Sequence, residues 1–140
     1  MFVFDAERVG KWVTEKAGGE YTHVCTAIGY EKNGQLIAGV MYDGYSGASI
    51  SMHSRIDGPV NREFFWMVFD YPFNQLQVKN VRGMVISNNA KAIRLNKHLG
   101  FKREAMLRDY FQDGDAIVFC MSRDDCRFLG SKYVRFTQTA

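Results

Sequence analysis

A hairpin signal near the start of the chain limits its fold more than any other feature of the sequence. The dipeptide Asn33-Gly34 separates two runs rich in β-branched and apolar residues within Thr22–Asp43. A two-residue type I′ turn needs positive φ at both central residues, and Asn-Gly meets this requirement well. The sequence therefore predicts two adjacent antiparallel strands in this region.

The other predicted elements alternate between helices and strands. Asp5 can cap a helix that runs to about Lys16, and residues 48–56 alternate apolar and polar side chains like a half-buried strand. The later predictions are a helix within 58–78 that Pro72 kinks or divides, a strand at 81–86, a helix from Asn88 or Asn89 to Gly100, and a hairpin turning at Asp113-Gly114. The expected fold class is α/β (α+β), with a mixed, mainly antiparallel central sheet flanked by helices.

Length and composition favour a single domain spanning residues 1–140. The 140 residues, 46% of them hydrophobic, suffice for one sizeable core and are too few for two. Residues 131–140 carry no strong signal, and we expect a tail that is ordered only through contact with its neighbours.

Cysteine usage and the apolar runs indicate the setting of the protein. Its three cysteines do not form a zinc-site pattern, so we expect a reduced environment and no metal. Asp5 interrupts any secretory h-region, and no apolar run approaches the ~20 residues of a membrane span. We therefore expect a cytoplasmic protein without a membrane partner.

Positive charge is concentrated in one part of the chain, although the net charge is only +3. No carboxylate occurs between Asp70 and Glu104, a segment with seven bases: Lys79, Arg82, Lys91, Arg94, Lys97, Lys102 and Arg103. This pattern favours an anionic ligand. No exposed aromatic residues are interleaved with a basic stripe, so nucleic acid is not the expected ligand.

One segment, NNAKAIRLNKHLGFKREAMLRD, resembles the Gcn5-related N-acetyltransferase (GNAT) family, especially its branch of ribosomal-protein alanine acetyltransferases. The family pattern falls on Asn89, Ala92, Leu99, Gly100, Phe101, Glu104, Arg108 and Asp109. The element order over roughly residues 20–122 agrees with the same family. The resemblance implies a GNAT-type fold and an N-acetyltransferase that transfers an acetyl group from acetyl-coenzyme A to a primary amine.

The resemblance also implies where the cofactor binds. In the family, the strands equivalent to 48–56 and 81–86 splay apart and the pantetheine arm fills the gap, while the pyrophosphate lies at the N-terminus of the next helix. The cofactor contacts implied here are Met52, Ser54, Arg55, Gly58, Val60, Asn61, Arg62, Asn89, Arg94, Asn96 and Lys97.

Two positions depart from the family pattern. Val60 stands where the phosphate loop usually has glycine or alanine, so we expect Arg55, Asn61 and Arg62 to reach the phosphates with their side chains. Asn96 stands where many members have a tyrosine that protonates the departing thiolate. An amide cannot act as that acid, and the general acid stays unassigned.

Candidates for the general base lie near the expected thioester. Backbone N–H groups of Met52 to Ser54 would bind the developing oxyanion, and the base candidates are His53, Glu63, Asp109 and Tyr110. Histidine suits proton transfer near neutral pH best. The alternative interpretations are a strand-end histidine that hydrogen-bonds a loop and an Asp109 that pairs with a cation such as Arg108.

The acceptor site looks open from the length of the chain before Thr22. One helix of about twelve residues fits there, where family members usually have two. An open cleft suits a protein N-terminus, a lysine or an extended amine, so the expected partners are acetyl-coenzyme A and an unidentified amine, with a homodimer also considered. The rival hypothesis is a catalytically silent GNAT-fold module that binds a partner or nucleic acid.

Overall fold

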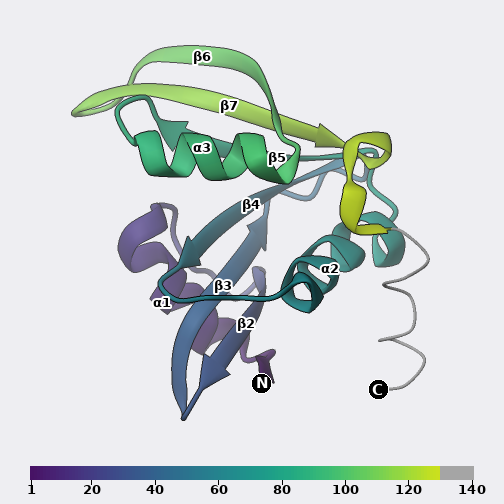
Figure 1. Cartoon of the computed structure of the whole chain (residues 1–140). Coiled ribbons are helices and arrows are strands. Elements are labelled where there is room, and N and C mark those ends of the chain that lie inside the picture. Colours follow the sequence, from purple (N-terminus) through teal and green to yellow (C-terminus); the bar gives the residue numbers. More distant parts are fainter. Residues whose placement is uncertain (130–140) are drawn as a thin grey trace.

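Seven strands form one sheet that carries helices on both faces (Figure 1). The structure is a computed structural model that describes residues 1–129, so the predicted tail lies outside the described residues. The strands are β1 (Phe2–Val3), β2 (Thr26–Lys32), β3 (Gln35–Asp43), β4 (Ser49–Ile56), β5 (Asn80–Ile86), β6 (Lys102–Phe111) and β7 (Gly114–Ser122). Their order is β1-β2-β3-β4-β5-β7-β6, and every neighbouring pair is antiparallel except β4 and β5. The predicted fold class is confirmed.

Turn chemistry explains both hairpins. Asn33 and Gly34 have φ of 55° and 79°, as a type I′ turn requires, and they join β2 to β3. Phe111 pairs with Gly114, so the second hairpin turns at Gln112-Asp113. Our prediction of Asp113-Gly114 was one residue too late, because Gly114 already belongs to β7. Strand β1 was not predicted, because its two residues are too few for a periodic pattern.

Three α-helices lie where the sequence predicts them. They are α1 (Ala6–Ala17), α2 (Arg62–Asp70) and α3 (Ala90–Leu99), and the side chains of Asp5, Asn61 and Asn89 accept hydrogen bonds from their first turns. Gly100, with φ of 112°, ends α3 in the left-handed conformation. Pro72 divides the second predicted helix: α2 ends at Asp70 and a π-helical turn follows over Tyr71–Gln75.

The sheet separates two hydrophobic clusters. On one face, Val9 and Val13 of α1 pack against β2 and β3 residues such as Met41. On the other face, α2 and α3 pack on a larger cluster that includes Phe69 and Phe119. Gly39 lets α1 approach closely, since a Cβ there would lie 3.0 Å from methyl groups of Val9 and Val13.

The sheet parts between its two central strands. β4 and β5 pair at three positions, with Ser49–Ser51 opposite Asn80–Arg82, and then diverge, as Figure 1 shows. Beyond this point β4 continues to pair with β3, and β5 with β7. The predicted splay is therefore present, and it positions the site.

Candidate cofactor and acceptor site

Backbone groups of β4 point into the gap between β4 and β5. The Ile37 carbonyl of β3 accepts from Asp57 N–H at 2.8 Å, and bonding sides alternate along a strand. His53 and Arg55 therefore direct their peptide groups toward β3, whereas Met52 and Ser54 direct theirs into the gap. Across it, a Cβ on Gly83 would lie 3.5 Å from the Met52 carbonyl oxygen. The Met52 N–H still belongs to the ladder with Arg82, so the gap offers the Met52 carbonyl and the peptide groups of Ser54 to a ligand that lies in it as a strand would.

The N-terminus of α2 is the second feature able to hold an anion. Asn61 caps the helix by accepting from Phe64 N–H at 3.2 Å. Within residues 1–129, the backbone N–H groups of Val60, Asn61, Arg62 and Glu63 have no hydrogen-bond partner. Asn61 and Arg62 are exposed. This end of α2 combines free donors, the helix dipole and a guanidinium.

Two amides of the preceding loop are already used. Asp57 and Gly58 both donate to the Ile37 carbonyl, at 2.8 and 3.2 Å. Gly58 also packs tightly, since a Cβ there would lie 3.3 Å from the Ile37 Cβ. Val60 is half-buried against the larger cluster. The backbone donors that stay free in this region are thereby limited to residues 60–63.

The Arg55 side chain is held against α1 and is not free to bind a phosphate. Its guanidinium lies 3.9 Å from the Trp12 ring centroid, donates to the Trp12 carbonyl at 2.8 Å, and pairs with Glu15 at 3.0 Å and Asp57 at 2.7 Å. These contacts bind the side chain to α1. Hydrogen bonds from the Arg55 guanidinium hold the pKa of the Asp57 carboxyl below its usual range. The side chain is occupied, so the expectation that it reaches a phosphate is not met in this structure.

A histidine–carboxylate pair lies beside the parted strands. His53 Nε2 is 3.0 Å from Asp43 Oδ1, and both side chains are partly exposed. A carboxylate can only accept, so neutral His53 carries its proton on Nε2 and leaves Nδ1 as the acceptor. Nδ1 faces the Gly18-Gly19 turn after α1, where a Cβ on Gly19 would lie 3.1 Å away. Sequence reasoning proposed His53 and missed Asp43, although pairing of β3 with β4 makes these residues diagonal neighbours.

The α3 residues divide between helix structure and solvent. Asn89 caps the helix through Ala92 N–H at 3.1 Å, and the Asn96 side chain donates to the Ala92 carbonyl at 2.8 Å. Arg94 and Lys97 are exposed. Asn96 keeps its side-chain oxygen as an acceptor, so the helix offers one amide oxygen and two cations to a ligand.

Asp109 and Tyr110 lie apart from His53. They belong to the edge strand β6, which β7 and β5 separate from β4. At about 4.8 Å per strand, this places β6 roughly 14 Å from β4. Asp109 has φ of 53° in an irregular part of β6, and its N–H donates to Asp115 at 2.8 Å. Glu63 lies in the first turn of α2. The structure therefore does not bring these candidates together with His53.

Arg82 and Glu104 form an ion pair near the point where the strands part. Arg82 donates to both carboxylate oxygens of Glu104, at 3.0 and 3.2 Å, and to Ser49 Oγ at 2.9 Å. The Arg82 hydrogen bond lowers the pKa of Glu104, and burial raises the pKa of the nearby Cys120 thiol. Sequence reasoning counted Arg82 only as part of a basic segment. Its partner lies 22 residues away on a non-adjacent strand, which no local pattern reveals.

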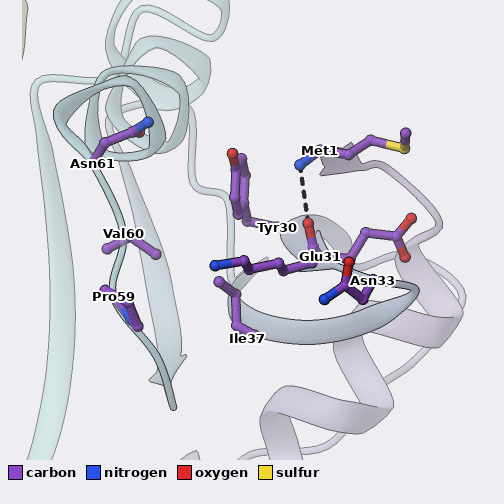
Figure 2. Close-up of a pocket in the computed structure, with 9 residues that line it drawn as sticks. Met1, Tyr30, Glu31, Asn33, Ile37, Pro59, Val60 and Asn61 are labelled. Atoms are coloured by element: carbon purple, nitrogen blue, oxygen red, sulfur yellow. Dashed lines mark hydrogen bonds between the residues drawn. The ribbon is translucent and has the colours of Figure 1, made fainter.

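An open pocket of about 560 Å³ lies on the other side of the phosphate loop (Figure 2). Its walls include Val60 and Asn61 on one side and Tyr30 and Ile37 on the other. The Met1 amino group donates to the Glu31 carbonyl at 3.0 Å at its rim. The pocket contains neither His53 nor Asp43, so it is distinct from the gap between β4 and β5.

Comparison with protein families agrees with this geometry. The family model described as an acetyltransferase (GNAT) domain matches residues 22–117, more than half of the chain. The chain belongs to the GNAT acetyltransferase family. The family prediction is confirmed, and acetyl-coenzyme A is the co-substrate that the family uses. A comparison with curated proteins gave no match for this GNAT chain.

Solved structures show the same fold. A chimera of the spermidine N-acetyltransferase SpeG from Vibrio cholerae and hSSAT is 18% identical, with a TM-score of 0.70, 93% of this chain and 99% of that chain covered. The ribosomal-protein-S18-alanine N-acetyltransferase from Escherichia coli is 17% identical, with a TM-score of 0.59 and coverage of 87% and 94%. The ribosomal-protein-S5-alanine acetyltransferase from Vibrio fischeri is 18% identical, with a TM-score of 0.61 and coverage of 86% and 72%.

No group of three or more His, Cys, Asp or Glu side chains among residues 1–129 is placed to hold a metal ion. None of the described helices combines the length and apolar character needed to cross a membrane.

Proposed function

We propose that this GNAT chain is an N-acetyltransferase that transfers an acetyl group from acetyl-coenzyme A to a primary amine. The observation that carries the proposal is the gap between β4 and β5, where the Met52 carbonyl and the Ser54 peptide groups lie beyond the last paired position, beside the His53–Asp43 pair. A ligand with amide groups along an extended chain suits such a gap. The N-terminus of α2 supplies donors for its phosphates.

The residues present fit the cofactor at three places. Backbone groups of Met52 and Ser54 would pair with the pantetheine amides, and the N–H groups of residues 60–63 with Arg62 would bind the pyrophosphate. The α3 side chains would lie nearest the nucleotide, where Asn89, Arg94, Asn96 and Lys97 remain candidates. When bound, acetyl-coenzyme A supplies a thioester carbonyl that a neutral amine can attack.

His53 is the base that we favour. The acceptor amine would have to lose a proton when the N–C bond forms and the C–S bond breaks with release of the coenzyme A thiolate. His53 Nδ1, which faces the Gly18-Gly19 turn, would take that proton through a water. Asp43 fixes the ring orientation and stabilises the imidazolium that results. The backbone N–H of Ser54, which points into the gap, would donate to the developing oxyanion. Asp109, Tyr110 and Glu63 rank behind His53 because they lie elsewhere in the fold.

The acceptor that we favour is an extended amine such as a protein N-terminus or a lysine. One helix, α1, precedes β2, and residues 18–25 form no second helix that would close the cleft. An open cleft admits a chain that continues beyond its amine. Spermidine and ribosomal-protein acetyltransferases both occur among the similar structures, so both acceptor classes belong in the test.

The phosphate loop also supports a second candidate, the silent GNAT-fold module. Asp57 and Gly58 give their amides to Ile37, and Arg55 is held by α1. A loop with fewer free donors binds a pyrophosphate less tightly. The two candidates differ in whether acetyl-coenzyme A binds and turns over.

Release of free thiol from acetyl-coenzyme A tests the proposal. The purified chain is incubated with free-N-terminus peptides, a lysine peptide with a blocked N-terminus, and spermidine. We expect thiol release above the no-amine control for at least one amine, with a mass increase of one acetyl group in that acceptor. Thiol release that never exceeds the control for any amine would contradict the proposed activity and favour the silent module.

A further inference from the structure

An exposed row of apolar side chains crosses three strands next to the gap. We call it the apolar row, and it consists of Met84 on β5, Val118 on β7, and Ala105 and Leu107 on β6. Met84 pairs with Val118, Val118 with Ala105, and Leu107 with the adjoining Ala116. Residues opposite each other in a sheet share a face, so these side chains are neighbours.

The apolar row lies on the same face of the sheet as His53. Arg82 hydrogen-bonds Ser49 on β4, and Met84 and His53 follow these residues at even intervals, so their side chains project from one face. The opposite face of β7 carries Ile117 and Phe119, which belong to the cluster under α2 and α3. The apolar row therefore faces the side of the sheet where α1 covers β2 to β4.

The apolar row is accessible and carries no charge of its own. Met84 is 42% exposed and Leu107 is 40% exposed. Glu104, next to Ala105 on β6, is already paired with Arg82. A polycation would find few free negative partners at these positions, whereas an apolar group would lose contact with water here.

Building on the proposed acetyltransferase function, we infer that the apolar row binds apolar side chains of the acceptor. The acceptor is then a peptide N-terminus with apolar residues just after its amine, rather than a polyamine. The row extends over three strands, about 10 Å, and an extended peptide covers this distance with about three residues at 3.3 Å each. Continuity with His53 along one face lets the amine reach the gap while the following side chains lie on Met84 and Leu107.

Matched peptides and matched variants test this inference. The probes are a peptide with a free N-terminal alanine and leucine at positions two to four, its counterpart with serine at these positions, and spermidine. We expect kcat/KM for the leucine peptide to exceed that for the serine peptide by about tenfold or more, since each apolar group buried contributes a factor of this order. Leu107→Ser should reduce this preference several-fold, chiefly by lowering kcat/KM for the leucine peptide.

Met106→Ser is the control variant. Met106 is 41% exposed on the same strand, but it pairs with Ile117 and so projects from the other face. We expect it to keep the leucine preference, and thermal melting checks that both variants fold. Equal rates for the two peptides, a preference for spermidine, or equal losses in both variants would overturn the inference.

A binding measurement separates this inference from the proposed function. Fluorescence anisotropy of labelled peptides in the presence of coenzyme A should show a Kd about tenfold lower for the leucine peptide, with the difference reduced by Leu107→Ser only. Selective binding without thiol release would refute the acetyltransferase and leave the apolar row as a peptide site. A wild-type dimer that Leu107→Ser dissociates, without selective peptide binding, would assign the row to a second copy and overturn the inference.

Discussion

At the scale of single residues, His53 and Arg55, two positions apart on β4, differ in how their side chains are engaged. His53 and Arg55 project from the same face. Arg55 makes three polar or aromatic contacts with α1 and an ion pair with Asp57, whereas His53 pairs with Asp43 and has a ring nitrogen facing a glycine turn. A side chain with all its donors engaged stabilises the fold. A side chain with a free acceptor next to an open gap is suited to proton transfer.

The first prediction concerns His53. His53→Ala should lower kcat by about 10² or more, because general-base catalysis typically contributes about 10² to 10⁴. The acid limb of the pH–rate profile should disappear with it, and Kd for acetyl-coenzyme A should hardly change. Asp43→Asn should lower kcat by about tenfold or more, since an amide can present its N–H and favour the other tautomer.

His23→Ala provides the matched control, because His23 is exposed in the segment before β2. It should retain kcat and the acid limb. If His53→Ala also retains both, His53 is a structural residue and Glu63, Asp109 or a water must take the proton.

The second prediction concerns the pH dependence of stability at Asp57. Its pKa is lowered in the folded protein by Arg55, so its contribution is present above the unfolded pKa near 3.9 and is lost as pH falls through the folded value. Asp57→Asn should reduce the free energy of unfolding at pH 7 by about 1 kcal/mol. The deficit should shrink below about pH 4, as the wild-type carboxylate is protonated.

Urea unfolding at several pH values measures this difference. Glu7→Gln is the control, since its ion pair with Lys11 has both side chains 64% exposed. That variant should stay within about 0.5 kcal/mol of the wild type. A deficit for Asp57→Asn that is constant from pH 7 to pH 3 would show that the charge of Asp57 is not the cause.

At the scale of elements, the β4–α2 connection combines structural and binding roles in five residues, 57–61. Its first two amides are used to hold β3, and its last residue caps α2. The free donors that remain are the N–H groups of Val60 and Asn61 and of the first two residues of α2. The end of the connection and the helix terminus together therefore carry the proposed phosphate contact.

The third prediction separates the cap from the cofactor contact. Asn61→Asp should keep the melting temperature, because aspartate caps a helix as well as asparagine. It should weaken acetyl-coenzyme A binding by about tenfold, since it adds a negative charge near the proposed pyrophosphate, and the effect should diminish at high salt. Asn61→Ala should instead lower the free energy of unfolding by about 1 kcal/mol.

Isothermal titration at two salt concentrations, with thermal melting of each variant, distinguishes these effects. Asp5→Asn at the cap of α1 is the control, and it should leave cofactor affinity unchanged. Unchanged affinity in a folded Asn61→Asp variant would place the pyrophosphate away from α2.

Local chemistry explains which elements could be predicted from the sequence. Caps, the Asn33-Gly34 turn, Pro72 and the period of two or 3.6 each act within a few residues, and they predicted three helices and six strands. The two-residue β1 has no such signal and depends on pairing with β2. The second hairpin turn was predicted one residue too late because Gly114 was taken for a turn residue. Glycine is required there for another reason: a Cβ on Gly114 would lie 3.2 Å from the Ile86 side chain.

The candidate site could be predicted only in part. The family resemblance indicated β4, β5 and the N-termini of α2 and α3, each of which is a continuous stretch of the sequence. Asp43 beside His53, and α1 holding Arg55, depend on side-chain directions across strands and helices, and one sequence does not specify these. The sequence therefore predicts a helix or strand better than it predicts the contacts of the side chains within it.

At the scale of the whole molecule, the sheet consists of two halves that meet over three paired positions. β1 to β4 form one half with α1, and β5 to β7 form the other with α3. A ligand in the gap contacts both halves, so it should stabilise the molecule as a whole.

The fourth prediction follows from this arrangement. Acetyl-coenzyme A at 100 times its Kd should add about 2.7 kcal/mol to the free energy of unfolding. For a chain of this size this corresponds to a rise in Tm of roughly 5 to 10 °C. Differential scanning calorimetry measures it, with adenosine as the control ligand that cannot enter the gap as an extended chain. No rise with acetyl-coenzyme A would favour the silent module.

The three-position join between β4 and β5 also has a mechanical consequence. β3 and β4 pair at six positions and β5 and β7 at seven, so the central join is the weakest seam between the longer strands, leaving aside the two-residue edge strand β1. Under a pulling force applied across the sheet, we expect the chain to tear at this seam first. A molecule bound in the gap would hold the two halves together, and the force needed to separate them would then show whether the gap is occupied.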